Sequence, residues 1–218
     1  MPWKIIKTLW YWLARWVCRL FFAFFFKLRV YGKENIPGKG PFLLVSNHQS
    51  YLDPVLCGVA IERHLQYLAR DSLFANRFFK ILISSLNAIP VRREEADLKA
   101  MKSVIEKLKH NWGVTLFPEA TRTSDGRISP LKAGFGLLAK RAQASVIPMV
   151  IDGAFEAWPR DQSLFSTGGM IIITYGKPIS YQLIKDMDER ELASRITGYL
   201  REIQNKSRLK HRKKTYEY

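Results

Sequence analysis

A histidine and an aspartate five positions apart are the residues of this chain best placed to do chemistry. His48 and Asp53 lie in residues 47–53, directly after the apolar run of residues 42–45. Histidine is the side chain whose unperturbed pKa lies nearest neutrality, and a carboxylate on its other ring nitrogen would fix its tautomer and stabilise the imidazolium. No partner serine or cysteine nucleophile is obvious, so the hydroxyl to be activated belongs to a substrate. This pattern favours direct group transfer.

The same pair also has a plain structural explanation. Asp53 followed by Pro54 is a good helix start, with Asp as the N-cap and Pro in the first helical position. A histidine with an aspartate nearby is common by chance. Function is favoured only because a second polar block lies downstream.

That second block follows the apolar run of residues 114–117. Pro118 cannot donate to a sheet and marks the end of the strand. Arg122 offers a planar fork for a phosphate or a carboxylate, and Glu119 could hold that fork in place. The polar residues that cannot belong to a core are Glu119, Thr121, Arg122 and Thr123.

A third apolar segment ends in the cations Arg92 and Arg93. Taken singly, two such arginines are more often solvated charge than part of a site. In open α/β sheets, however, ligands bind at the carboxyl ends of the strands. Three apolar runs that each end in polar residues therefore predict one shared site.

The pattern of the whole chain predicts an α/β fold with a single mixed, largely parallel sheet covered by helices. Its 218 residues suit one sizeable domain. We expect strands at 28–32, 42–46, 65–69, 87–91, 114–117, 146–151 and 170–175, and helices at 54–63, 74–85, 94–111, 132–143 and 188–205. Residues 28–205 are expected to form the catalytic domain, preceded by an N-terminal helix (1–27) and followed by a basic tail (206–218).

The N-terminal segment predicts an amphipathic helix. Residues 3–26 are rich in Trp, Phe and Leu, but Arg15 and Arg19 interrupt the apolar run and no small-residue cleavage site is present. On a helical projection the basic residues share a narrow sector opposite a wide aromatic face. We expect this helix to lie in a membrane interface with its cations reaching lipid phosphates, although packing on the domain is the alternative.

Charge is concentrated at the two ends of the chain. The formal net charge is +16, from 35 basic and 19 acidic residues. Residues 1–29 hold six cations and no acid, whereas residues 206–218 hold six cations and one acid. The mildly basic remainder does not indicate a nucleic-acid groove. The basic tail is either a solvated terminus, a contact for anionic lipids, or a contact for an acidic carrier protein.

Several other classes of site are not indicated. The two cysteines, Cys18 and Cys57, imply no disulfide framework and are typical of a reducing cytoplasm. The four histidines are scattered without metal-ligand spacing, and no nucleotide-type phosphate loop is present. We therefore expect no metal and no cofactor.

Four blocks together resemble the glycerolipid acyltransferase family, whose best-known members are the 1-acylglycerol-3-phosphate acyltransferases. His48 and Asp53 match its His-x4-Asp motif, and residues 117–123 are similar to its Phe-Pro-Glu-Gly-Thr-Arg-Ser block. Residues 88–93 resemble the block that ends in a phosphate-binding arginine, here Arg93, and residues 146–150 resemble the fourth block. The blocks occur in the family's order over roughly residues 30 to 180; the first and third are specific.

Three positions depart from the family's pattern. Ala120 and Asn87 stand where Gly is frequent, and Thr123 stands where Ser is usual. A Cβ at position 120 disfavours positive φ and takes space beside the expected headgroup pocket. These departures leave transfer chemistry intact but put the usual acceptor, lysophosphatidic acid, in doubt.

The resemblance implies a glycerol-3-phosphate/lysophosphatidate acyltransferase-like fold and an O-acyltransferase of phospholipid biosynthesis, attached to the cytoplasmic face of a membrane. The acyl donor would be acyl-CoA or acyl-carrier protein and the acceptor a lysophospholipid. His48 would be the base, Asp53 its orienting acid, and Arg93 and Arg122 the phosphate ligands, with Glu119 and Thr121 organising the cluster. The alternatives are an acyltransferase or transacylase for another lysolipid or hydroxylated lipid, and a non-catalytic membrane-binding protein.

Overall fold

One sheet organises the molecule. The computed structural model describes residues 2–91 and 98–218, without the side chains of residues 2–5, 7 and 79. Within this part of the chain, seven strands lie in the order β1-β7-β6-β2-β5-β3-β4, and all neighbours are parallel except β6 and β7. The strands are β1 (Lys27–Tyr31), β2 (Phe42–Ser46), β3 (Leu65–Arg70), β4 (Ala88–Val91), β5 (Gly113–Leu116), β6 (Ser145–Asp152) and β7 (Met170–Tyr175). The predicted mixed, largely parallel sheet is confirmed.

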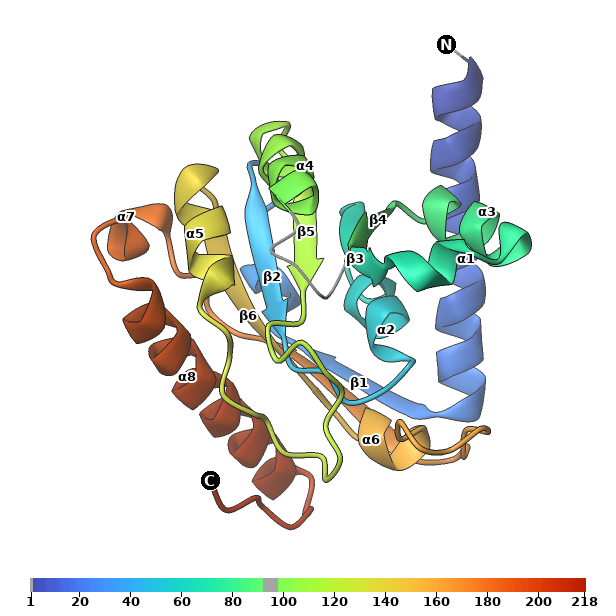
Figure 1. Cartoon of the computed structure of the whole chain (residues 1–218). Coiled ribbons are helices and arrows are strands. Elements are labelled where there is room, and N and C mark those ends of the chain that lie inside the picture. The colour runs from blue at the N-terminus through green and yellow to red at the C-terminus, as the bar shows by residue number, and fades with distance from the viewer. Residues whose placement is uncertain (1, 92–97) are drawn as a thin grey trace.

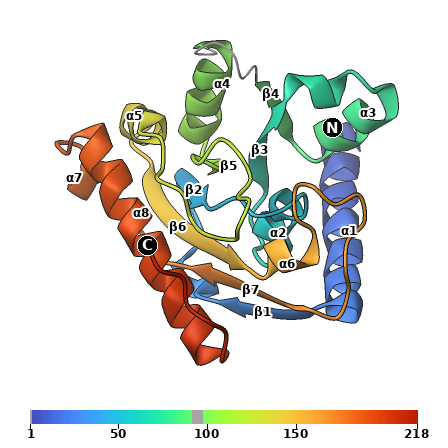
Figure 2. The ribbon, with the colours of Figure 1, turned by 60° about the horizontal axis from the view of Figure 1, so that its bottom comes forward.

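Helices cover both faces of this sheet (Figure 1). They are α1 (Pro2–Phe25), α2 (Asp53–Val59), α3 (Arg77–Ser85), α4 (Leu98–Lys109), α5 (Gly134–Arg141), α6 (Ala154–Ala157), α7 (Tyr181–Ile184) and α8 (Glu189–Lys210), with 3-10 turns η1 (Lys33–Asn35) and η2 (Asp71–Phe74). Side chains of α4, α5 and α8 build one apolar core, and those of α1, α2 and α6 build a second. Figure 2 shows α1 and α8 at opposite sides of the sheet.

The central strands are apolar because both of their faces are covered. All five residues of β2 are buried, and β2 lies between β5 and β6. Parallel strands buried on both faces have continuous apolar sequences rather than alternating ones. This explains why the short apolar runs of the sequence located the strands correctly.

Helix ends differ more from expectation than strands do. α2 ends at Val59, four residues before the predicted end, and α3 begins at Arg77 after a separate 3-10 turn. α8 continues to Lys210, five residues beyond the predicted end, because no Gly or Pro interrupts residues 199–210. The expected boundary at residue 206 therefore falls inside this helix, and Arg208 in the expected basic tail is buried with 7% exposure.

α1 packs on the domain through its polar stripe, contrary to our expectation for that stripe. The Arg15 guanidinium donates to the Ile61 carbonyl, and Arg19 Nε donates to the Val59 carbonyl at 2.6 Å. Helix C-termini leave carbonyls unsatisfied and favour nearby cations, so the end of α2 is the natural partner of these arginines. The expectation that Arg15 and Arg19 reach lipid phosphates was wrong.

The other side of α1 is apolar and faces outward. Its exposed residues are Ile6, Leu9, Trp10, Leu13, Trp16, Val17, Leu20, Phe24 and Phe25. Among the described helices, none combines the length and the apolar character needed to cross a bilayer. α1 is thus an amphipathic helix whose polar side and Phe22 meet protein, whereas many of its other apolar side chains stay exposed.

Candidate active site

The two specific sequence blocks meet at one edge of the sheet. β2 and β5 are parallel neighbours, with Val45 paired to Leu116 at their carboxyl ends. Residues 47–53 leave the end of β2, and residues 117–123 leave the end of β5. Because the two strands end side by side, their following loops contact one another. The expectation of a shared polar edge is met for these two blocks.

His48 and Asp53 form a direct pair. His48 Nδ1 lies 2.8 Å from Asp53 Oδ2, which also accepts the backbone amides of Gln49 at 2.5 Å and Ser50 at 2.7 Å. The Asp53 side chain is fully buried, whereas that of His48 is 17% exposed. With Nδ1 held by the carboxylate, Nε2 is the ring nitrogen left to serve a substrate hydroxyl. The arrangement can orient an imidazole and balance its charge.

The block after β5 fixes the backbone and ring of His48. The His48 amide donates to Glu119 Oε1 at 2.7 Å, and the Thr123 amide donates to the His48 carbonyl at 2.9 Å. The imidazole also stacks on Phe117, with centroids 4.3 Å apart and planes 22° apart. Both sequence blocks therefore act on one side chain. Phe117 belongs to the second sequence block, but its ring contact could not be read from the sequence.

Glu119 is a structural carboxylate in this geometry. Oε1 takes the His48 amide and Oε2 takes the Ser129 amide at 2.8 Å. Burial raises the pKa of Glu119 to about 7, although the two backbone amides favour its ionised form. The expectation that Glu119 holds the Arg122 fork is not what the structure shows, because both of its oxygens are directed to backbone amides.

Arg122 lies over an aromatic ring of the histidine motif. Its guanidinium carbon is 3.5 Å from the centroid of the Tyr51 ring, a cation–π contact. Its Nη1 atom is buried and has no hydrogen-bond partner among the described residues. A buried guanidinium nitrogen without an acceptor is costly, and an anionic ligand would satisfy it. Thr121 is exposed beside it.

The remaining expected cations are not placed. Arg92 and Arg93 fall outside the described residues, so the prediction that Arg93 belongs to the site remains a prediction. β4, which precedes them, lies at the end of the sheet beside β3.

The departures from the family pattern keep the glycine-like backbone. Ala120 has φ +61° and Asn87 has φ +68°. A left-handed residue with a Cβ costs about 1–2 kcal/mol, less for Asn. Ala120 is exposed, so its methyl group does not fill the buried interior. The residue keeps the left-handed backbone that a glycine would adopt there.

Comparison with known proteins agrees with this geometry. Residues 27–152 match the sequence model of the acyltransferase family. The 1-acyl-sn-glycerol-3-phosphate acyltransferase of Bacillus subtilis is 29% identical over 184 residues, which cover 82% of this chain and 89% of that protein. A chloroplastic 1-acyl-sn-glycerol-3-phosphate acyltransferase of Arabidopsis thaliana is 27% identical over 158 residues, covering 71% of this chain and 44% of that protein.

A solved structure shares the fold. The 1-acyl-sn-glycerophosphate acyltransferase of Thermotoga maritima superposes with a TM-score of 0.74 at 23% identity, over 88% of this chain and 75% of that chain. The match to the family's sequence model covers both blocks of the site and more than half of the chain. The protein therefore belongs to the acyltransferase family.

Proposed function

We propose that this acyltransferase moves a fatty acyl group from an acyl thioester to the hydroxyl of a lysophospholipid of the 1-acylglycerol-3-phosphate class. The relatives carry that activity in their names. The observation that carries the proposal is the His48–Asp53 pair, 2.8 Å apart, with the guanidinium of Arg122 on Tyr51 in the same motif. The pair can accept the proton of a hydroxyl group, and the guanidinium can donate hydrogen bonds to a phosphate.

In this mechanism His48 Nε2 takes the proton of the acceptor hydroxyl while its oxygen attacks the thioester carbonyl. The tetrahedral intermediate then expels the thiolate, which receives the proton from the imidazolium, so that a thiol and an ester are formed. Asp53 holds the tautomer through Nδ1 and offsets the transient positive charge. Base catalysis of this kind is typically worth about 10²- to 10⁴-fold.

The acceptor phosphate would bind Arg122, whose Nη1 lacks a partner among the described residues. Arg93 is a second candidate on the strength of the family resemblance, and exposed Thr121 is a candidate contact beside Arg122. Glu119 acts on the acceptor only indirectly, by holding the backbone of His48.

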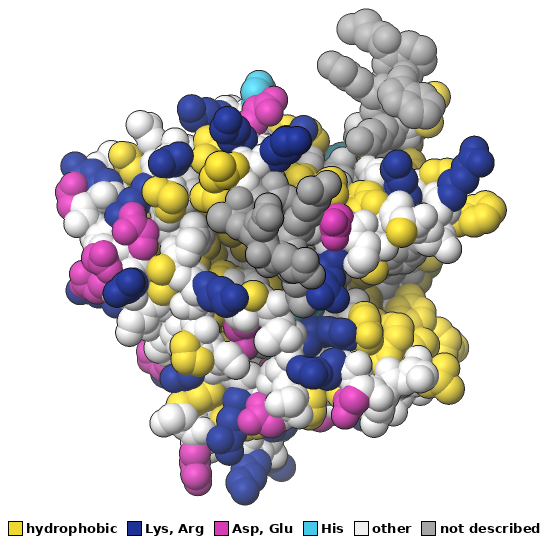
Figure 3. Space-filling model, in the orientation of Figure 1, with side chains coloured by type: hydrophobic (Ala, Val, Ile, Leu, Met, Phe, Trp, Pro, Cys, Tyr) yellow, Lys and Arg dark blue, Asp and Glu magenta, His cyan; other side chains and the backbone are white. Residues whose placement is uncertain are grey.

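The protein would work as a monotopic enzyme at the cytoplasmic surface of a membrane that contains anionic lipids. The apolar side of α1 supports this, since a helix in water normally turns such a side inward. α3 adds exposed Phe78, Ile81 and Leu82. Figure 3 shows hydrophobic side chains and cations together on the side of the molecule where α1 and α3 lie.

The base is tested with His48→Ala. We expect kcat/KM to fall about 10²- to 10⁴-fold with the fold intact, because the hydroxyl loses its proton acceptor. His110→Ala is the matched control, since that histidine is exposed after the end of α4 and its ring bonds only the Glu106 carbonyl in the described contacts. Activity of His48→Ala near that of the control would remove His48 from the mechanism.

The phosphate ligand is tested with Arg122→Lys, which keeps the charge but loses the planar fork. The acceptor KM should rise while the donor KM stays constant. Arg127→Lys in the same loop, which lies 3.6 Å from Asp125, serves as the control. An acceptor KM equal to that of the control would reject Arg122 as the phosphate ligand.

Donor and acceptor are identified by product analysis. A panel of lysolipids is offered with acyl-CoA and with acyl-carrier protein, and mass spectrometry identifies the ester formed. Turnover with phospholipid as sole donor would indicate a transacylase. Membrane binding without any product would favour a non-catalytic protein on this fold.

A further inference from the structure

The carbonyl of Gly126 joins the catalytic motif to α8. It accepts Gln49 Nε2 at 2.9 Å and Gln204 Nε2 at 3.1 Å. Gln49 directly follows His48, and its own backbone amide donates to Asp53 Oδ2. Both glutamine side chains are fully buried. One backbone oxygen in the loop of residues 124–131 is therefore bonded from both sides.

The same loop is held by a C-terminal strap, which we define as residues 211–218. The Ile128 amide donates to Tyr218 Oη at 3.2 Å, and that hydroxyl donates to Gln204 Oε1. Arg201 donates to the Ile128 carbonyl and lies over the Tyr218 ring. The next residue of the loop, Ser129, donates to Glu119, which in turn holds the His48 amide.

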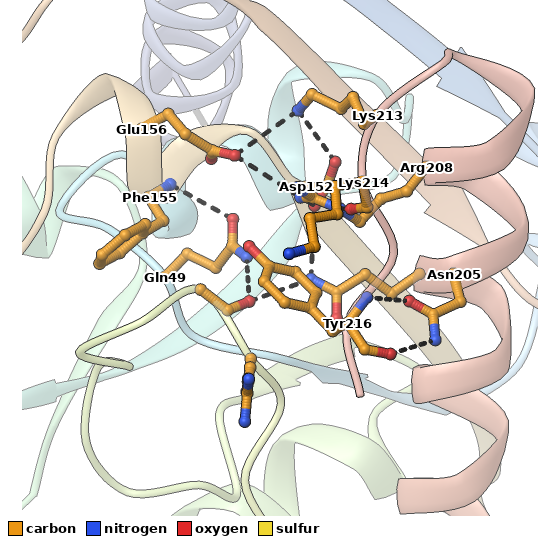
Figure 4. Close-up of polar contacts among 12 residues, drawn as sticks. Gln49, Asp152, Phe155, Glu156, Asn205, Arg208, Lys213, Lys214 and Tyr216 are labelled. Atoms are coloured by element: carbon orange, nitrogen blue, oxygen red, sulfur yellow. Dashed lines mark hydrogen bonds and ion pairs between the residues drawn. The ribbon is translucent and has the colours of Figure 1, made fainter. Parts of the chain in front are cut away.

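The strap is itself anchored to the sheet. Asp152 at the end of β6 is fully buried and accepts Arg208 at 2.6 Å and Lys213 at 3.0 Å. The backbone N–H and carbonyl of Tyr216 bond the Asn205 side chain, each at 2.9 Å. A Cβ on Gly126 would lie 2.2 Å from Tyr216 Oη, so the strap fits closely against a glycine in the left-handed region. Figure 4 shows these groups converging between α8 and the loop.

We propose that the strap positions the His48–Asp53 pair, with Tyr218 and Gln49 as positioning residues that act through the loop of residues 124–131. Two short routes lead from the strap to the pair. One passes through Gln204, the Gly126 carbonyl and Gln49 to Asp53; the other passes through Ile128, Ser129 and Glu119 to the amide of His48. The inference rests on the proposed function only in taking His48 as the base.

Arg208 in the last turn of α8 and Lys213 in the strap serve this anchoring. Arg208 and Lys213 were expected to meet lipids or an acidic carrier protein, but both are directed to Asp152. A basic tail that folds back and pairs two of its cations with a buried carboxylate is held in one place. Such a fixed segment can hold a loop in register, whereas a solvated tail cannot.

The test compares Tyr218→Phe with Tyr199→Phe. Each removes one hydroxyl that accepts a backbone amide, from Ile128 and from Lys177 respectively, and Tyr199 lies on α8 away from the loop. Activity is measured with palmitoyl-CoA and with palmitoyl-carrier protein, using 1-acylglycerol-3-phosphate in detergent micelles. We expect Tyr218→Phe to lower kcat about tenfold with both KM values within about twofold, because a small misplacement of a base costs rate more than binding. Equal kcat values for the two variants would overturn the proposal.

A double-mutant cycle guards against a loss that is merely structural. Gln49→Ala should also lower kcat, and adding Tyr218→Phe should lower it little further, since both act through one loop. Independent, multiplying losses would overturn the proposal. Lys213→Met loosens the strap without touching the loop and should lower kcat in the same direction, which covers a Tyr218 variant that fails to fold.

His48→Ala in the same assay separates this inference from the proposed function. An active His48→Ala enzyme contradicts the proposed base. An inactive one, combined with full activity of Tyr218→Phe, contradicts only the role of the strap.

Discussion

The two long helices of this protein, α1 and α8, are both amphipathic but are turned in opposite directions. α8 buries its apolar residues Leu192, Ile196 and Leu200 and places the ion pairs Glu191–Arg195 and Glu202–Lys206 outside. α1 buries Tyr11, Arg15 and Phe22 but leaves a row of large apolar side chains exposed, Phe24 with 84% exposure. The same fold thus contains one long helix with a charged outer surface and one with an apolar outer surface.

The contrast concerns the outer surfaces of the two helices. The exposed ion pairs of α8 contribute little to stability but keep the surface hydrated. A contiguous apolar surface of the size of α1 is a recognised mark of an interaction site. The polar side of α1 contacts protein, which leaves its exposed apolar side for the membrane contact proposed above.

The largest effect should come from the anchor of α8. Asp152→Ala leaves Arg208 buried without its closest carboxylate, and we expect a loss of about 3–5 kcal/mol in the free energy of unfolding by urea denaturation. Glu202→Ala breaks the exposed pair with Lys206 and should cost at most about 1 kcal/mol. Similar costs would show that burial does not distinguish the two pairs.

A cavity comparison between the helices comes next. Leu200→Ala, at a fully buried position of α8, should cost about 2–5 kcal/mol of unfolding free energy. Leu13→Ala on α1 removes a side chain that is already 57% exposed and should change stability by no more than about 0.5 kcal/mol. A large loss at Leu13 in the absence of lipid would mean that this side of α1 is packed in solution.

Vesicle binding sharpens the comparison at the surface. The double substitution Leu13→Glu and Trp16→Glu should weaken binding to phosphatidylcholine–phosphatidylglycerol vesicles by about 10²-fold, because each buried apolar side chain is worth about 1.5–3 kcal/mol. Arg195→Glu on the outer side of α8 should leave it nearly unchanged. Sedimentation with vesicles measures both, and unchanged binding of the α1 variant would contradict membrane docking through this helix.

The smallest effect concerns the polar side of α1. Arg19→Met loses the bond to the Val59 carbonyl and should cost about 1–3 kcal/mol of stability, with vesicle affinity retained. Arg29→Met, an exposed position on β1, is the control. Lower vesicle affinity at unchanged stability would instead place Arg19 among lipid phosphates.

Much of the fold could be predicted because its signals are local. Each strand is a short apolar run ended by Pro, Gly or polar residues, and buried parallel strands need nothing more elaborate. His48 and Asp53 were found because they follow one such run at a spacing that lets them meet. Arg122 was found for the same reason after the next strand of the site.

What could not be predicted depends on contacts between distant segments. Periodicity shows that Arg15 and Arg19 share a side of α1, but only the position of the α2 carbonyls makes that side face inward. Glu119 was expected to hold a side chain, and nothing local indicates that backbone amides from residues 48 and 129 reach it first. The basic tail likewise needs Asp152, more than fifty residues away, to become ordered.

α2 connects the docking of α1 to the His48–Asp53 pair over a very short distance. It begins at the acid that holds the imidazole and ends at the carbonyl that holds Arg19, so its seven residues form a rod of about 10 Å. The contact with α1 and the contact with His48 therefore lie at opposite ends of one short helix.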